Sequence, residues 1–277
     1  MEPEWTDIWY AALKELVGRF GELKCQKARD WQAALKPILY THRYPAVPQK
    51  RPQAENMAPP ADPVLEQAPS SLQPRTPRPD VAVGLDAARL GPLDSILKEL
   101  QEAPLDSGFT YLLSDPCTTA PSGMRFPFFV AELRSSGRAM IEAENRVAVG
   151  GSCALSILRS LENGAAADGE DSGLRTFSLT TEGIYASLWQ HCYTSEDPQS
   201  QQISITPLGL YRVSDRNDST RLIQDLAAIF AWGAGDFKTR VTRRAYAPVG
   251  LDVPSSLSLP THVPGSPYFR PRYDSGH

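Results

Sequence analysis

Three charged residues follow or precede apolar runs in a way that could bring them together. The run from Phe126 to Ala131 leads into Glu132 and Arg134, and Asp80 comes directly before the β-branched run from Val81 to Leu85. Because side chains alternate along a strand, Glu132 and Arg134 project from one face where the predicted strand ends. If the two strands run antiparallel, the carboxylates of Asp80 and Glu132 meet at one edge of a sheet.

Two carboxylates beside a cation can support metal-dependent chemistry on phosphates. Carboxylate oxygens hold Mg²⁺, and the metal polarises a phosphate and lowers the pKa of bound water. An arginine at position 134 stabilises charge but is always protonated, so it does not exchange a proton with water. The same groups can instead form a closed network of ion pairs, with Arg134 and Arg146 in the space of a metal. From these residues alone both interpretations stay open.

A helical pattern follows the predicted strand from Ala139 onward. At 100° per residue, Arg146 falls near the middle of an arc that predicts contact with the sheet, whereas Asn145 points to solvent. An arginine in that place needs a carboxylate, a phosphate or water, and Glu132 is the nearest candidate. The small and apolar residues of this arc are Ala139, Ala143, Gly150, Cys153, Ala154, Ile157, Leu158 and Leu161.

The remaining patterns predict an α/β layered domain with additions at both ends. Helices are expected at 5–39, broken near Gly21, at 93–102 and after a Ser219 cap, with a hairpin over 176–181 and 184–193 and a bent strand over 202–213. The expected organisation is an N-terminal helical segment (1–44), a Pro-rich disordered linker (45–78), the layered domain (79–247) and a disordered C-terminal tail (248–277).

Composition excludes several classes of protein. A net charge of −4 argues against coating nucleic acid by charge alone. The basic segment Lys238 to Tyr246 could touch phosphates beside the site, but the preferred interpretation is an exposed strand or loop with no ligand. The four cysteines have no spacing typical of zinc or disulfide frameworks. An acidic start and the lack of a long apolar run predict an intracellular protein of the cytoplasm or nucleus, with no membrane association.

Three motifs, in this order, resemble the PD-(D/E)XK restriction-endonuclease-like superfamily. They are RPDVAVGLD from Arg78, RFPFFVAELRSSG from Arg125 and AENRVAVGGSC from Ala143. They are similar to an uncharacterised fungal branch of that superfamily that reads approximately RPD-x-x-VG, FPF-x-VVE-x-K and AxNQ-x-AVSGAC, and SLTTEGIYASLWQHCYTSED resembles its later strands. The resemblance covers about Arg78 to Trp232. It implies a restriction-endonuclease-like mixed sheet flanked by helices.

The resemblance also implies roles for site residues. Asp80 and Glu132 would hold a divalent metal, usually Mg²⁺, with the Leu133 carbonyl as a third ligand. Arg134 stands where the superfamily has its catalytic lysine, and Arg146 replaces the glutamine after the helix asparagine; both departures count against full activity. The expected function is therefore a degenerate nuclease fold that binds nucleic acid or protein, with an active Mg²⁺-dependent phosphodiesterase as the alternative.

Other polar residues have simpler interpretations. Asp115 and Glu182 are turn residues first, although Asp115 is a second-choice acidic ligand, and His191 is explained as a core or edge-strand histidine. The apolar stripe of the N-terminal helix predicts docking on the main domain or on a partner helix. Substrate, pathway and oligomeric state are not indicated by the sequence.

Overall fold

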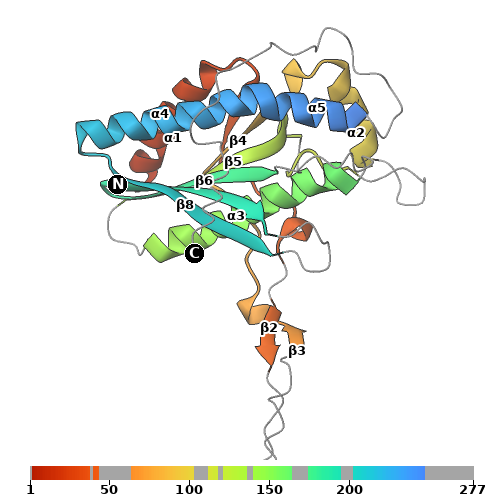
Figure 1. Ribbon diagram of the computed structural model, residues 1–277, viewed down its shortest axis with the longest axis horizontal. Coiled ribbons are helices and arrows are strands. Elements are labelled where there is room, and N and C mark those ends of the chain that lie inside the picture. The colour runs from red at the N-terminus through yellow and green to blue at the C-terminus, as the bar shows by residue number, and fades with distance from the viewer. Residues whose placement is uncertain are drawn as a thin grey trace, which may run out of the picture.

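A computed structural model describes residues 2–37, 40–43, 64–102, 112–117, 121–135, 140–163, 174–194 and 202–246 (Figure 1). The predicted tail, the first part of the predicted linker and the acidic loop after Asn163 lie outside these residues. The helices are α1 (Glu2–Gly18), α2 (Pro92–Glu102), α3 (Met140–Asn163), α4 (Arg216–Trp232) and α5 (Lys238–Tyr246). The strands are β1 (Leu23–Lys27), β2 (Tyr40–Arg43), β3 (Val64–Gln67), β4 (Val81–Asp86), β5 (Met124–Arg134), β6 (Arg175–Glu182), β7 (Tyr185–Tyr193) and β8 (Ile203–Arg212).

Six strands form one mixed sheet between two layers of helices. The strand order is β1-β4-β5-β6-β7-β8, and every neighbouring pair is antiparallel except β5 and β6. Helix α3 makes the crossover that a parallel pair requires. Figure 1 shows α1, α4 and α5 over one face of the sheet and α3 over the other. The predicted α/β layered fold is confirmed.

Strand β5 lies at the centre and is buried along its whole length, as expected for a strand covered on both faces. It contains a bulge opposite β4: Val83 pairs with Phe129 but Leu85 pairs with Arg125, and Phe126 has a φ of 47°. A Cβ on Gly84 would lie 2.7 Å from the Arg125 carbonyl oxygen, so only glycine fits opposite the bulge.

The bulge changes which side chains share a face. Strict alternation along β5 would put Phe128 on the face of Val130, Glu132 and Arg134, but Phe128 packs against Trp232 and Phe237 on the α4 side. Val130 instead faces Gly150 of α3. The strict alternation of side chains therefore holds only beyond the bulge, where it places Glu132 and Arg134 on the α3 side.

Helix α3 confirms the predicted arc. Asn145 is exposed, and the small and apolar residues of the predicted arc are buried, whereas Arg146 in the same arc is exposed; Ala139 lies outside the described residues. A Cβ on Gly151 would lie 2.5 Å from the imidazole of His191, which makes a 2.8 Å hydrogen bond through Nε2 with the Ser178 hydroxyl. Burial lowers the pKa of His191 to about 4. His191 is therefore a neutral core histidine, as predicted.

The N-terminal segment differs from the prediction of helix over 5–39. Helix α1 ends at Gly18, and β1 then pairs antiparallel with β4 at the edge of the main sheet. The apolar stripe up to Val17 is helical as expected. Beyond Gly21, backbone pairing with β4 overrides the residual helical spacing, because an edge strand gains hydrogen bonds that a short isolated helix does not.

Three further boundaries are corrected by the structure. Residues 64–78 were assigned to the linker, but they contain β3, which pairs with β2 in a separate two-stranded sheet, and buried Ala68 and Pro77. The basic segment Lys238–Tyr246 is a helix, not a strand or loop. Helix α4 is capped by Asp215, whose carboxylate accepts from two backbone N–H groups, rather than by Ser219.

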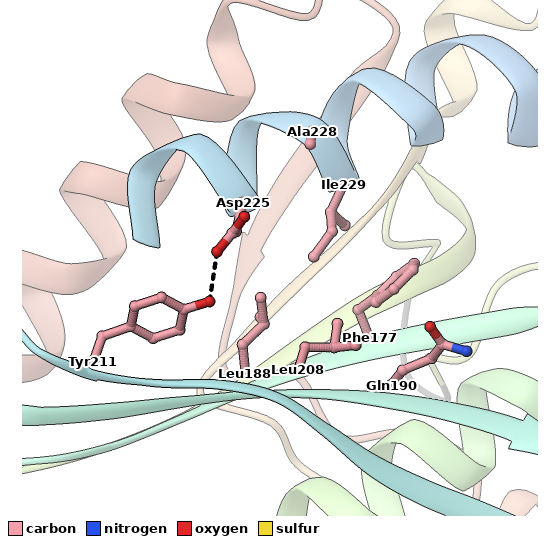
Figure 2. A pocket seen from close by; sticks show the side chains of 8 residues that line it. All are labelled: Phe177, Leu188, Gln190, Leu208, Tyr211, Asp225, Ala228 and Ile229. Atoms are coloured by element: carbon pink, nitrogen blue, oxygen red, sulfur yellow. Dashed lines mark hydrogen bonds between the residues drawn. The ribbon is translucent and has the colours of Figure 1, made fainter. Parts of the chain in front are cut away.

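A small cavity lies between α4 and strands β6 to β8, and Figure 2 shows its lining. Its volume is about 30 Å³, enough for about one water molecule. The Tyr211 hydroxyl donates to Asp225 of α4 at 2.5 Å beside it (Figure 2). This cavity is too small for a ligand. Among the described helices, none is both long and apolar enough to cross a bilayer.

Candidate functional site

The antiparallel pairing of β4 and β5 brings the two predicted carboxylates together. Val81 pairs with Ala131, which places Asp80 beside Glu132 at the end of β5. The Leu133 N–H donates to Asp80 Oδ2 at 2.8 Å, so a backbone group of β5 orients the Asp80 carboxylate. The juxtaposition inferred from the two sequence runs is therefore present.

The Arg134 guanidinium lies between these carboxylates. Its Nη1 is 3.3 Å from Asp80 Oδ2, and its Nη2 is 3.1 Å from Glu132 Oε2. Only 7% of Arg134 and 3% of Glu132 is exposed. A charge-assisted pair is stronger where water is excluded, but each buried charge also loses hydration, so the two effects oppose each other. We call Asp80, Glu132, Arg134 and Arg146 the charged cluster.

Arg146 reaches the same carboxylate from α3. Its Nη1 is 3.8 Å from Glu132 Oε2, and its Nη2 donates to Glu142 at 2.9 Å within the helix. The Arg146 side chain is 44% exposed, so the guanidinium keeps contact with water while it faces the cluster. The predicted partner Glu132 is therefore one of two carboxylates near Arg146, and Glu142 of the same helix is the nearer one.

The surroundings of Glu132 favour its protonated form over its ionised form. Burial and the neighbouring Asp80 carboxylate raise the pKa of Glu132 to about 8, although Arg134 and Arg146 act in the opposite direction. The loss of hydration by the carboxylate outweighs the attraction to the two arginines. A carboxyl group that holds its proton near neutral pH is typical of functional sites, and it is the most perturbed acid of the cluster.

The arrangement suits a guanidinium better than a divalent metal. Both carboxylates already have Arg134 as a partner, and Leu133 presents its N–H to Asp80. Across the described ranges, no three His, Cys, Asp or Glu side chains are grouped so that they could hold a metal ion. A metal at this place would need both carboxylates ionised and Arg134 displaced.

Three contributors to this end of the sheet were missed by sequence reasoning. The Thr181 hydroxyl accepts from the Arg134 N–H at 3.1 Å, and the Trp5 indole N–H donates to that hydroxyl at 3.2 Å. The Ala28 N–H donates to the Asp80 carbonyl at 2.9 Å, next to β1. The threonine pair in SLTTEG was the only available signal for Thr181. Trp5 and Ala28 depend on where α1 and β1 lie in the sheet, which no local pattern indicated.

Other predicted candidates lie elsewhere. The Asp115 carboxylate accepts from the backbone N–H groups of Cys117 and Ser122, so it shapes a buried turn. Helix α4 begins at the end of the sheet that carries the charged cluster. Asp218 in its first turn accepts from the N–H of Arg212, the last residue of β8. The helix then runs about 25 Å before α5 starts. The basic residues of α5 therefore lie at the opposite end of the sheet and not beside the site. Among them, Lys238 is paired with Glu22 at 2.5 Å.

A known protein family matches most of the chain. The family model described as domain of unknown function (DUF7924) matches residues 37–243, about three quarters of the chain. This chain belongs to the DUF7924 family. The match contains the whole charged cluster, but it leaves out α1 and β1, which pack on the same sheet in this member. No curated protein and no solved structure gave a match.

Proposed function

We propose that this DUF7924 protein is a degenerate nuclease-like module of the PD-(D/E)XK type that binds a partner without cutting it. The observation that carries the proposal is the position of Arg134, within 3.3 Å of both carboxylates that would hold a metal. Its guanidinium supplies the positive charge that a metal would otherwise supply. It provides no open coordination position for a water nucleophile.

Charge favours a protein partner over a nucleic acid. The chain carries a net charge of −4, and the charged cluster contains two acids and two arginines, with Glu142 as a third acid beside Arg146. A nucleic-acid surface is normally a continuous basic patch. The basic helix α5 stands at the other end of the sheet, and the Lys238 charge is already paired.

An active Mg²⁺-dependent phosphodiesterase is the second candidate. It is favoured by the convergence of Asp80 and Glu132, because the Asp80 side chain is 20% exposed and could meet a metal from solvent. In that case Asp80 and Glu132 would hold the ion and Arg134 would swing out to stabilise charge on the phosphate. No proton transfer by Arg134 is possible, so water would have to be activated by the metal.

Calorimetric titration of Mn²⁺ and Mg²⁺ into the full chain separates the two candidates. Wild type is expected to give only the heat of dilution. Saturable binding that disappears in Glu132→Gln but persists in Glu142→Gln, together with cleavage of single- or double-stranded DNA or RNA, would establish the second candidate instead. Glu142 is a suitable control because it contacts Arg146 without belonging to the charged cluster.

The Arg134→Lys variant tests the role assigned to the guanidinium. A lysine ammonium is compact and cannot form a planar bridge to two carboxylates, so one carboxylate should be released. We expect this variant to gain Mn²⁺ binding that wild type lacks.

Labelled DNA and RNA should bind wild type weakly and lose that binding in moderate salt, as nonspecific contacts do.

A further inference from the structure

An apolar groove lies between α1 and α4. The two helices approach at their far ends, where the Phe20 and Phe230 rings are 6.4 Å apart. The groove runs along α1 from Trp5 to Arg19 and along the first part of α4, from Ser219 to Leu226. Its volume is about 430 Å³, in the range of sites that bind extended peptides or small molecules. Its main apolar lining residues are Trp5, Ile8, Trp9, Leu16, Leu222 and Ile223.

The groove leaves large apolar side chains in contact with water. Ile8 of α1 is 58% exposed and Ile223 of α4 is 55% exposed. Isolated exposed apolar residues are common, but here they flank one concave surface that also contains two tryptophans, whose rings are 6.1 Å apart. A hollow apolar surface of this kind is typical of an interaction site. Cover from a chain segment would remove this area from water.

We propose that the segment Ser266–Tyr273 of this same chain, SPYFRPRY, docks in the groove. Its composition fits the surface, because Pro267 and Pro271 disfavour a helix and the aromatic pair Tyr268 and Phe269 supplies large apolar contacts. Proline-containing segments in an extended conformation dock in grooves lined by aromatic side chains. This inference does not depend on the proposed function of the charged cluster.

The segment and helix α1 differ in the sign of their charge, and the groove lining itself carries one acid and one base, Glu15 and Arg19. Helix α1 carries four acidic residues and one lysine, whereas SPYFRPRY carries Arg270 and Arg272 and no acidic residue. Within the groove lining, Glu15 is paired with Arg19 at 3.6 Å, but both side chains are largely exposed. An exposed pair of this kind is weak, so Glu15 can exchange its partner at little cost.

The tether is long enough for the segment to reach the groove. From Ile223 the continuous helical path through α4 and α5 to Tyr246 is about 35 Å long, at about 1.5 Å per residue (Figure 1). The chain between Tyr246 and Tyr268 spans about 65 Å when extended. Covalent attachment also keeps the segment at an effective concentration of about a millimolar or more, so modest contacts suffice.

Docking would have a consequence for the charged cluster. Trp5 lines the groove and also donates to the Thr181 hydroxyl, which in turn accepts from the Arg134 N–H. A segment that packs on Trp5 would hold the indole in this position. The groove and the cluster are thus linked through two hydrogen-bonded side chains, those of Trp5 and Thr181.

Site-specific alkylation of the full chain tests the proposal. Ile223→Cys is introduced together with either the wild-type segment or the double variant Tyr268→Ser and Phe269→Ser, and labelling at position 223 is followed by mass spectrometry. We expect labelling to be about tenfold or more slower with the wild-type segment. Ile141→Cys is the control, because Ile141 of α3 is 67% exposed outside the groove and should be labelled equally in both backgrounds.

A peptide that spans 262–277 gives the complementary measurement. Added to the chain that carries Ile223→Cys, Tyr268→Ser and Phe269→Ser, it should restore protection of the introduced thiol, and the additional change Ile8→Asp should prevent that. Equal labelling of the introduced thiol in both backgrounds overturns the proposal and leaves the groove for a separate partner. Protection in both backgrounds that is lost on dilution also overturns it and assigns the groove to a second copy of the chain.

Discussion

Two buried arginines lie near opposite ends of β5 and have different surroundings. Arg125, near its beginning, is 3% exposed; its Nε donates to Asp94 at 2.8 Å, and its Nη1 donates to the Ser114 hydroxyl at 2.9 Å. Arg134, at its end, is 7% exposed and lies between two carboxylates. Arg125 therefore has one charged partner and two neutral ones, since its Nη1 also donates to Gln101 at 3.4 Å, while Arg134 has two charged partners.

The pKa values of the acids beside these two arginines shift in opposite directions. Burial alone would raise the pKa of Asp94, but hydrogen bonds from Lys98 and Arg125 lower it below its ordinary value. Burial and Asp80 raise the pKa of Glu132 to about 8. Asp94 thus gains more from its cations than it loses by burial, whereas Glu132 loses more by burial than it gains from two arginines and retains unfavourable energy that binding could relieve. This difference is why we assign the function to the Arg134 end of the strand.

Removal of Arg134 should have the largest effect on stability. Arg134→Met leaves two neighbouring carboxylates without the cation that bridges them, so we expect a loss of about 3–5 kcal/mol at pH 8. The loss should be smaller at pH 5.5, where Glu132 carries a proton. Urea unfolding at the two pH values measures both numbers. A loss below about 1 kcal/mol at pH 8 would mean that the bridge contributes little.

The next largest effect should be the change of the wild-type unfolding free energy with pH. Because the folded state raises the pKa of Glu132 from its ordinary 4.5 to about 8, the folded protein holds this proton more tightly than the unfolded chain. The contribution to stability is thus full below pH 4.5 and is lost as pH rises to 8, on the order of a few kcal/mol.

Glu132→Gln isolates this contribution, and Glu142→Gln is its control. The difference in unfolding free energy between wild type and Glu132→Gln should become less favourable to wild type from pH 5 to pH 8. The lowered pKa of His191, about 4, acts in the opposite sense below pH 6.5, but it is common to both proteins and cancels. A difference that is flat with pH would contradict the raised pKa.

Removal of Arg125 should cost less and should not depend on pH. In Arg125→Met the Asp94 carboxylate keeps Lys98, which lies 2.6 Å away, so we expect a loss of about 2 kcal/mol. Asp94 stays ionised from pH 5.5 to pH 8 because its pKa is lowered. Urea unfolding at both pH values checks this. A clear pH dependence would show that the surroundings of Arg125 and Arg134 differ less in their electrostatics than the opposite pKa shifts of Asp94 and Glu132 indicate.

The smallest expected effect concerns the support of the Arg134 end by α1. Trp5→Phe removes the indole N–H that donates to Thr181 while it keeps an aromatic ring in place, and we expect a loss of about 1 kcal/mol. Thermal unfolding measures it, with Trp9→Phe as the matched change one turn along α1. Equal losses in the two variants would indicate that Trp5 acts through packing alone.

Local patterns were sufficient for much of the fold. The run from Phe126 to Ala131, the helix that carries Arg146 and the hairpin around Glu182-Gly183 were predicted because burial on a sheet produces strong periodicity over many residues. The pairing of Asp80 with Glu132 followed from one assumption, that β4 and β5 run antiparallel. The relation of Arg146 to Glu132 followed from the helical angle.

Long-range contacts decided the rest. Strand β1 forms because β4 offers it an edge, and the bulge at Phe126 forms opposite Gly84, so neither can be inferred from its own residues. Thr181 and Trp5 reach the charged cluster only because β6 lies parallel to β5 and α1 lies across the sheet.

The sequence by itself determined which groups are available: two carboxylates, two arginines and the strand and helix that carry them. The tertiary structure decided that Arg134 bridges both carboxylates and that burial holds a proton on Glu132 near neutral pH. The physical reason is that side-chain type and spacing are local, whereas distance, desolvation and pKa depend on which segments the folded chain brings together.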